Sequence, residues 1–200
     1  MANTNKDRIV AKLAKASVGI AGLGGLGSNV AIALARAGIG RLLIVDFDTV
    51  EKSNLNRQAY SVDQVGMRKT EALMQNIARA NPEVNVTAYC QKLETGNMAE
   101  AFSSADVIIE ALDAAATKAA FIEEVSLAYP SKPLIAASGV AGIRGVERVA
   151  LKKSGNLYLI QDDMAPSSDD SAVFAPKVGL FAHWQASLAL EILLEGTDVD

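Results

Sequence analysis

The feature that most constrains the fold of this chain is a glycine-rich turn between an apolar run and a helical pattern. Ser17–Ala21 is largely apolar and leads directly into the sequence Gly-Leu-Gly-Gly-Leu-Gly at 22–27. Ser28–Ala37 then carries apolar residues at helical spacing and stops at Gly38. Glycine suits such a turn because it tolerates positive φ and lets a phosphate approach bare backbone, while the following helix offers free N–H groups. The sequence therefore predicts a strand, a phosphate-binding turn and a helix.

The segments after this turn alternate between strand and helix patterns. The expected strands are Arg41–Val45, Val84–Tyr89, Val107–Ala111 and Pro133–Ala137. The expected helices are Lys69–Ala80, Met98–Phe102 and Ala114–Ala128. Such alternation is typical of a doubly wound, mostly parallel sheet, so the predicted fold class is α/β and Rossmann-like. Two further expected strands, Gly145–Leu151 and Leu157–Ile160, predict a short antiparallel extension near the C-terminus.

The chain has 200 residues, a length that one hydrophobic core can serve, and it contains no internal repeat or interdomain linker. We therefore expect one domain over residues 1–200. Residues 1–16 hold a predicted N-terminal helix, Asn5–Ala16, and Pro176–Leu194 is a predicted closing helix. The acidic, aperiodic stretch at 161–175 is predicted to be a mobile loop whose aspartates, Asp162, Asp163, Asp169 and Asp170, are solvated.

Composition excludes several classes of protein. The net charge of −4 argues against a nucleic-acid binder. No apolar run approaches the roughly 18 residues that a membrane span needs, and the polar start has no signal core, so we expect a cytoplasmic protein without membrane contact. The single cysteine, Cys90, excludes a multi-cysteine zinc site and is expected to be half-buried.

A second group of polar residues follows the second expected strand. Asp46 and Asp48 lie at its end, where a carboxylate can grip ribose hydroxyls. Asn54, Arg57 and Lys69 come next, and such a set can neutralise a triphosphate. The pattern favours ATP as the nucleotide.

An NAD-dependent oxidoreductase would use the same kind of turn and carboxylate, and it is the alternative. Three features argue against it. Gly25 is an extra glycine in the turn. A nicotinamide does not need the nearby cations Arg57 and Lys69, and no substrate domain follows the nucleotide-binding fold.

These motifs resemble the ThiF/MoeB/HesA family, the bacterial relatives of ubiquitin-activating enzymes. The matching stretches are the glycine turn, Asp46–Glu51, Ser53–Gln58, Val65–Lys69, Asp113 and Pro176–Ala186. The pairing of Asp-x-Asp with Asn-Leu-x-Arg-Gln is specific, whereas the glycine turn alone is not. The short chain looks most like the ThiF-type enzymes that adenylylate a sulfur carrier protein.

The resemblance implies ATP-dependent adenylylation of the C-terminal glycine carboxylate of a small ubiquitin-like carrier, ThiS-like and ending in Gly-Gly, in thiamine thiazole biosynthesis, with release of pyrophosphate. It implies these nucleotide-binding residues: Gly22, Gly24, Gly25, Gly27, Asp46, Asp48, Asn54, Arg57 and Lys69. It assigns catalysis to Arg57, Lys69 and Asp113, with Asp113 holding Mg²⁺. It also implies a homodimer in which Arg8 reaches the partner's ATP phosphates.

The chain departs from the family pattern in two places. Family members commonly show Asp-x-x-Asp-Asn where this sequence has Asp113-Ala-Ala-Ala116-Thr117. The lost pair supports a second alternative, a catalytically weak nucleotide-binding scaffold. Larger relatives carry zinc-binding cysteine pairs and often a reactive cysteine; with Cys90 alone, we expect no zinc, no covalent carrier intermediate and a separate sulfur donor protein.

Overall fold

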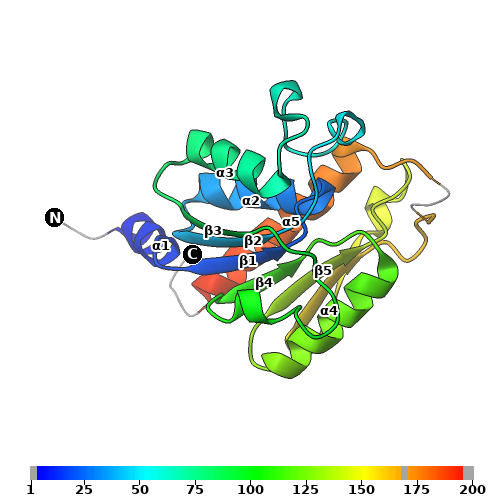
Figure 1. Cartoon of the computed structure of the whole chain (residues 1–200). Coiled ribbons are helices and arrows are strands. Elements are labelled where there is room, and N and C mark those ends of the chain that lie inside the picture. The colour runs from blue at the N-terminus through cyan, green and yellow to red at the C-terminus, as the bar shows by residue number, and fades with distance from the viewer. Residues whose placement is uncertain (1–3, 168–170, 196–200) are drawn as a thin grey trace.

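The computed structural model describes residues 4–167 and 171–195, and a seven-stranded sheet runs through them (Figure 1). The strands are β1 (Ser17–Ala21), β2 (Arg41–Val45), β3 (Asn85–Tyr89), β4 (Val107–Glu110), β5 (Leu134–Ser138), β6 (Ala150–Ser154) and β7 (Leu157–Gln161). Their spatial order is β3-β2-β1-β4-β5-β7-β6, and every neighbouring pair is parallel except β7 and β6. The predicted α/β fold with its antiparallel extension is confirmed.

Helices cover both faces of the sheet (Figure 1). They are α1 (Asn5–Leu13), α2 (Gly25–Ala37), α3 (Lys69–Ala80), α4 (Ala115–Ala128) and α5 (Ala175–Leu194), with 3₁₀ turns η1 (Lys52–Asn54), η2 (Val62–Gln64), η3 (Glu100–Phe102) and η4 (Val146–Arg148). On one face α2 packs against α3 and α5, and on the other Phe102 of η3 meets Phe121 of α4 edge to face at 5.5 Å between ring centroids. The central strands are buried on both sides, which explains their nearly continuous apolar sequences. No helix within the described ranges is long and apolar enough to cross a membrane.

The largest differences between predicted and observed helix boundaries are in the first two helices, whereas α4 and α5 each begin within one residue of the predicted position. The helix expected at Asn5–Ala16 ends at Leu13, because the chain turns there against Gly40, whose N–H donates to the Leu13 carbonyl at 2.9 Å. The helix expected from Ser28 already begins at Gly25, because the glycine turn itself forms the first helical turn.

The strand predicted at Gly145–Leu151 is present, but its predicted start is wrong, because the strand runs from Ala150 to Ser154. Gly145 has a left-handed φ of 95°, η4 follows it, and β6 begins only at Ala150. A Cβ at position 145 would lie 2.1 Å from an Arg148 side-chain nitrogen, so an ion-pairing arginine, not a sheet neighbour, shapes this segment.

The helix predicted at Met98–Phe102 is also wrong, since only the 3₁₀ turn η3 forms there. Glu124 of α4 accepts the N–H groups of Gly96 and Met98, at 2.7 and 2.8 Å. This tertiary contact satisfies the backbone in place of a helical turn.

The two edges of the sheet carry different structures (Figure 1). α1 leads into the amino-terminal end of β1, whereas the loops after β1, β2, β4, β5 and β7 all leave from the carboxyl-terminal edge. Ligands of open α/β sheets bind outside the carboxyl ends of the strands. The functional site is therefore expected at this edge.

Candidate functional site

A cavity of about 880 Å³ lies at the carboxyl-terminal edge of the sheet. Among the residues that line it are these from the sequence prediction: Gly22, Gly24, Gly25, Asp46, Asp48, Arg57, Lys69 and Asp113. Gly27, Asn54 and Arg8, which the structure also describes, do not line it. Stretches far apart in the sequence thus meet around one space of nucleotide size.

The glycines of the turn divide into two roles. Gly22 has a φ of 87°, and a Cβ there would lie 2.7 Å from the Ala111 carbonyl oxygen. A Cβ at Gly27 would lie 1.9 Å from the Gly22 carbonyl oxygen. These two glycines permit close packing of helix on turn, while Gly24 and Gly25 leave bare backbone facing the cavity at the start of α2.

Asp46 fixes the turn to the second strand. One carboxylate oxygen accepts the Leu23 N–H at 2.6 Å, and the other accepts the Asp48 N–H at 2.7 Å. Tyr60, which the sequence prediction missed, donates its hydroxyl to the Leu23 carbonyl at 2.8 Å. Burial, and then the negative charges of Asp46 and Asp48, raise the pKa of Tyr60, so its hydroxyl stays a neutral donor.

Lys69 begins α3 with its ammonium buried at the cavity wall. The Nζ atom lies 2.7 Å from an Asp48 carboxylate oxygen and 4.0 Å from one of Asp46. The predicted trio of Asp46, Asp48 and Lys69 is therefore brought together, with the cation directed toward two carboxylates.

Arg57 and Asn54 lie on the segment after β2, which contacts the first turns of α2. Arg57 lines the cavity, and its guanidinium donates to the Asn56 side-chain oxygen at 2.8 Å. Asn54 instead accepts the Glu51 N–H at 3.3 Å in η1. Asn29, another residue the prediction missed, donates to the carbonyls of Gly25 (2.6 Å) and Arg57 (3.0 Å) and so ties the arginine segment to the glycine turn.

Asp113 follows β4 and is exposed at the cavity, where it accepts the Ala114 N–H at 2.8 Å. Behind it, Lys118 donates to the buried Glu110 carboxylate at 2.9 Å and to the Leu112 carbonyl at 3.0 Å. Burial raises the pKa of Glu110, although Lys118 opposes that rise. Mg²⁺ on a nucleotide needs only one or two protein carboxylates, so Asp113 fits the role of a magnesium ligand.

The side of the cavity opposite the glycine turn is formed where β5 and β7 end and their loops begin. It consists of residues 138–141, 161–163 and 165–167, and Asp162 is one of them. The expectation of a solvated Asp162 is wrong, because its carboxylate is buried and receives hydrogen bonds from Arg148 and Lys177. Asp163 is exposed and pairs with Lys152 at 2.7 Å, whereas Asp169 and Asp170 lie outside the described residues.

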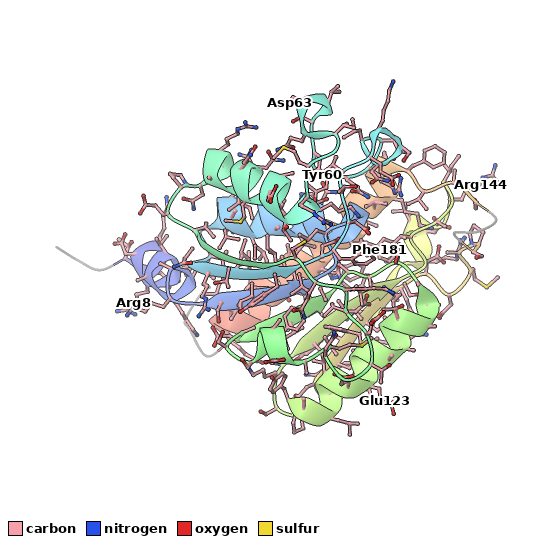
Figure 2. All side chains as sticks on the ribbon, in the orientation of Figure 1. Arg8, Tyr60, Asp63, Glu123, Arg144 and Phe181 are labelled. Carbon is pink, nitrogen blue, oxygen red and sulfur yellow. The ribbon has the colours of Figure 1, made fainter. Side chains whose placement is uncertain are left out.

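The loop predicted at 161–175 is shorter at both ends, since Gln161 completes β7 and Ala175 begins α5. Cys90, expected to be half-buried, is exposed. Arg8 is exposed on α1, on the far side of the molecule from Arg144 of the cavity loops (Figure 2). No group of three or more metal-binding His, Cys, Asp or Glu side chains occurs among residues 4–167 and 171–195.

Comparison with known proteins finds one protein family and relatives that are named as adenylyltransferases or activating enzymes. The ThiF family matches residues 2–199. The sulfur carrier protein ThiS adenylyltransferase of Escherichia coli is 32% identical over 189 residues, covering 91% of this chain and 74% of that protein. Adenylyltransferase and sulfurtransferase UBA4 of Kluyveromyces lactis is 34% identical over 201 residues, but the chain spans only 42% of its length. Ubiquitin-like modifier-activating enzyme 5 of Arabidopsis thaliana is 48% identical over 88 residues, 20% of its length.

Solved structures repeat the same architecture. The Escherichia coli tRNA N6-threonylcarbamoyladenosine dehydratase TcdA, in complex with ATP, superposes with a TM-score of 0.84 at 25% identity, covering 94% of this chain and 89% of that chain. The Escherichia coli protein MccB with ATP gives a TM-score of 0.75 at 21% identity and shares the fold.

Proposed function

The chain belongs to the ThiF family, and from this premise we propose that it is an adenylyltransferase that uses ATP to activate the C-terminal carboxylate of a small ubiquitin-like carrier protein. In this reaction the carboxylate attacks the α-phosphate of ATP. The products are the acyl adenylate and pyrophosphate. The proposal treats residues 1–200 as one ATP-binding domain.

The observation that carries the proposal is the gathering of Arg57, Lys69 and the free backbone of the glycine turn around one cavity. Adenylyl transfer needs positioning and neutralisation of phosphate charge more than it needs acid–base groups. Two cations and a helix N-terminus supply that neutralisation. The ATP bound to the structurally similar TcdA supports the same ligand here.

The proposal assigns a role to the main polar groups that line the cavity. The turn and α2 receive the phosphates, Asp46 receives the ribose hydroxyls, and Lys69 leaves Asp48 to meet the α-phosphate. Asp113 would hold Mg²⁺, which when bound stabilises the charge of the pyrophosphate leaving group. Lys118 keeps Asp113 in place through the Leu112 carbonyl.

The finer assignment is a ThiS-like carrier in thiamine thiazole biosynthesis, which the similarity to the Escherichia coli ThiS adenylyltransferase supports. We further propose a separate sulfur donor protein, a cytoplasmic location and a homodimer with Arg8 acting across the interface. The exposure of Arg8 at the opposite edge of the sheet suits a contact with a second copy rather than with its own cavity.

The test is exchange of labelled pyrophosphate into ATP in the presence of purified carriers ending in Gly-Gly, ThiS-type and molybdopterin-type. We expect exchange that requires carrier and Mg²⁺ and disappears when the two terminal glycines are deleted. ATP binding without exchange with any carrier would support the scaffold alternative, and a rise in melting temperature with NAD⁺ but not with ATP would support the oxidoreductase.

A further inference from the structure

Lys177 is a buried cation that the proposed chemical step does not use. It lies in the first turn of α5, and its side chain is only 3% exposed. Its ammonium donates to the carbonyls of Ala141 (2.8 Å) and Arg144 (3.1 Å) and to the Asp162 carboxylate (3.1 Å). A buried ammonium is tolerated when oxygen partners replace its water, and here three such partners converge on it.

Asp162 holds this cation in place. Its carboxylate also accepts from Arg148 Nε at 3.1 Å and from the Met164 N–H at 3.1 Å. Burial opposes ionisation, but the hydrogen bonds from Arg148 and Lys177 outweigh it and keep the pKa of Asp162 below its usual value. The carboxylate is thus charged at neutral pH and pairs with the Lys177 ammonium.

The two carbonyls held by Lys177 belong to a segment that runs from the cavity to the surface. Ala141 lines the cavity, whereas Ile143, between the two carbonyls, is 76% exposed. Gly142 has no Cβ, and a Cβ there would lie 3.1 Å from Pro166, so the segment packs directly on the loop after β7. Lys177 therefore fixes one continuous wall made of two loops.

We infer that Lys177 is a positioning residue for the second substrate, the carrier tail. The inference rests on the proposed function. Phosphates are drawn to Arg57 and Lys69 on the glycine-turn side, and the attacking carboxylate is assigned to the wall formed by the loops after β5 and β7, which lines the same cavity. That wall carries the exposed Ile143 at its outer end, and Lys177 sets the course of its backbone without lining the nucleotide space itself.

The test compares Lys177→Met, which removes the charge at nearly equal length, with Lys132→Met. Lys132 is a matched control because its ammonium also holds backbone carbonyls, those of Phe102, Ser103 and Ala105, but at the turn before β5 on the opposite edge. In carrier-dependent exchange we expect Lys177→Met to raise the KM for carrier about tenfold, with the KM for ATP changed less than twofold. Lys132→Met should leave both KM values unchanged.

Unchanged carrier KM in Lys177→Met, or an equal rise in both KM values, overturns the inference while wild-type exchange upholds the proposed function. Absence of exchange in the wild type overturns both. If Lys177→Met does not fold, the double variant Asp162→Asn/Lys177→Met also neutralises the buried carboxylate that lost its lysine partner. It carries the same expectation, because the two carbonyls still lose their donor.

Discussion

The two sides of the cavity each carry a lysine–aspartate pair, and the pairs differ in how much water reaches the carboxylate. In the Lys69–Asp48 pair, at 2.7 Å, the Asp48 side chain is 44% exposed. In the Lys177–Asp162 pair, at 3.1 Å, the Asp162 side chain is fully buried. A solvated pair contributes little and can exchange its partner, whereas a buried pair is costly to break.

This difference shows how one kind of contact can serve two purposes. Lys69 can leave Asp48 for a phosphate, because Asp48 then returns to water. Lys177 is 3% exposed and Asp162 is fully buried, so separating them would leave buried charges less well compensated. The glycine-turn side therefore suits binding and catalysis, and the opposite side suits a fixed surface for the second substrate.

The largest effect is expected on the glycine-turn side. Lys69→Ala and Asp113→Ala should each lower pyrophosphate exchange by about 10²–10³, since losing one contact to transition-state charge costs about 3–4 kcal/mol. Far-ultraviolet circular dichroism should show an unchanged fold. Exchange near the wild-type rate in both variants would rule out the assigned roles.

A mixing experiment extends the comparison to Arg8, which lies far from the cavity of its own chain. Arg8→Ala and Lys69→Ala should each be nearly inactive alone. After subunit exchange, about one quarter of the sites should be intact, because half of the dimers are mixed and each mixed dimer holds one complete site. Activity that does not recover in dimers shown to have exchanged, or a monomer by light scattering, contradicts a shared site.

The pH dependence of stability separates the two buried carboxylates beside the cavity. The lowered pKa of Asp162 means that it stabilises the fold above its unfolded pKa of about 3.9 and loses that contribution as pH falls through its folded value. Glu110, with a raised pKa, has the opposite sign: its contribution declines as pH rises from its unfolded pKa of about 4.3 toward its folded value.

We therefore expect the melting temperature of Asp162→Asn to lie below wild type at pH 7 and to approach it in acid. The melting temperature of Glu110→Gln, relative to that of the wild type, should be highest at neutral pH and lowest in acid. Differential scanning calorimetry from pH 3 to 8 measures both, and parallel pH profiles for the two variants would contradict the assigned directions.

The two sides of the cavity also differ in how far the sequence predicts them. The glycine-turn side is built from residues between Gly22 and Lys69, where local spacing places the carboxylates at a strand end and the lysine at a helix start. Those positions follow from the alternation of strands and helices. The doubly wound, mostly parallel sheet and its antiparallel extension were predictable for the same reason.

The opposite side depends on contacts across long sequence separations. In the sequence Asp162 belongs to a polar, aperiodic stretch. Only the fold brings Arg148 of η4 and Lys177 of α5 within ion-pairing distance of it. A lysine directly after the proline of an apolar helix was the available signal, because a charge on a buried helix start needs a partner. Tyr60 and Asn29 were missed likewise, since only the folded chain shows that they hold the glycine turn.

The central claim is that the two sides serve different substrates, and the affinity for ATP–Mg²⁺ tests it without knowledge of the carrier. Calorimetric titration should show ATP binding to the wild type, at least tenfold weaker binding to Arg57→Ala because a charge-assisted contact of about 1.5–3 kcal/mol is lost, and binding within twofold of wild type for Lys177→Met. Equal weakening in the two variants, or weakening only in Lys177→Met, would contradict the division between the two sides.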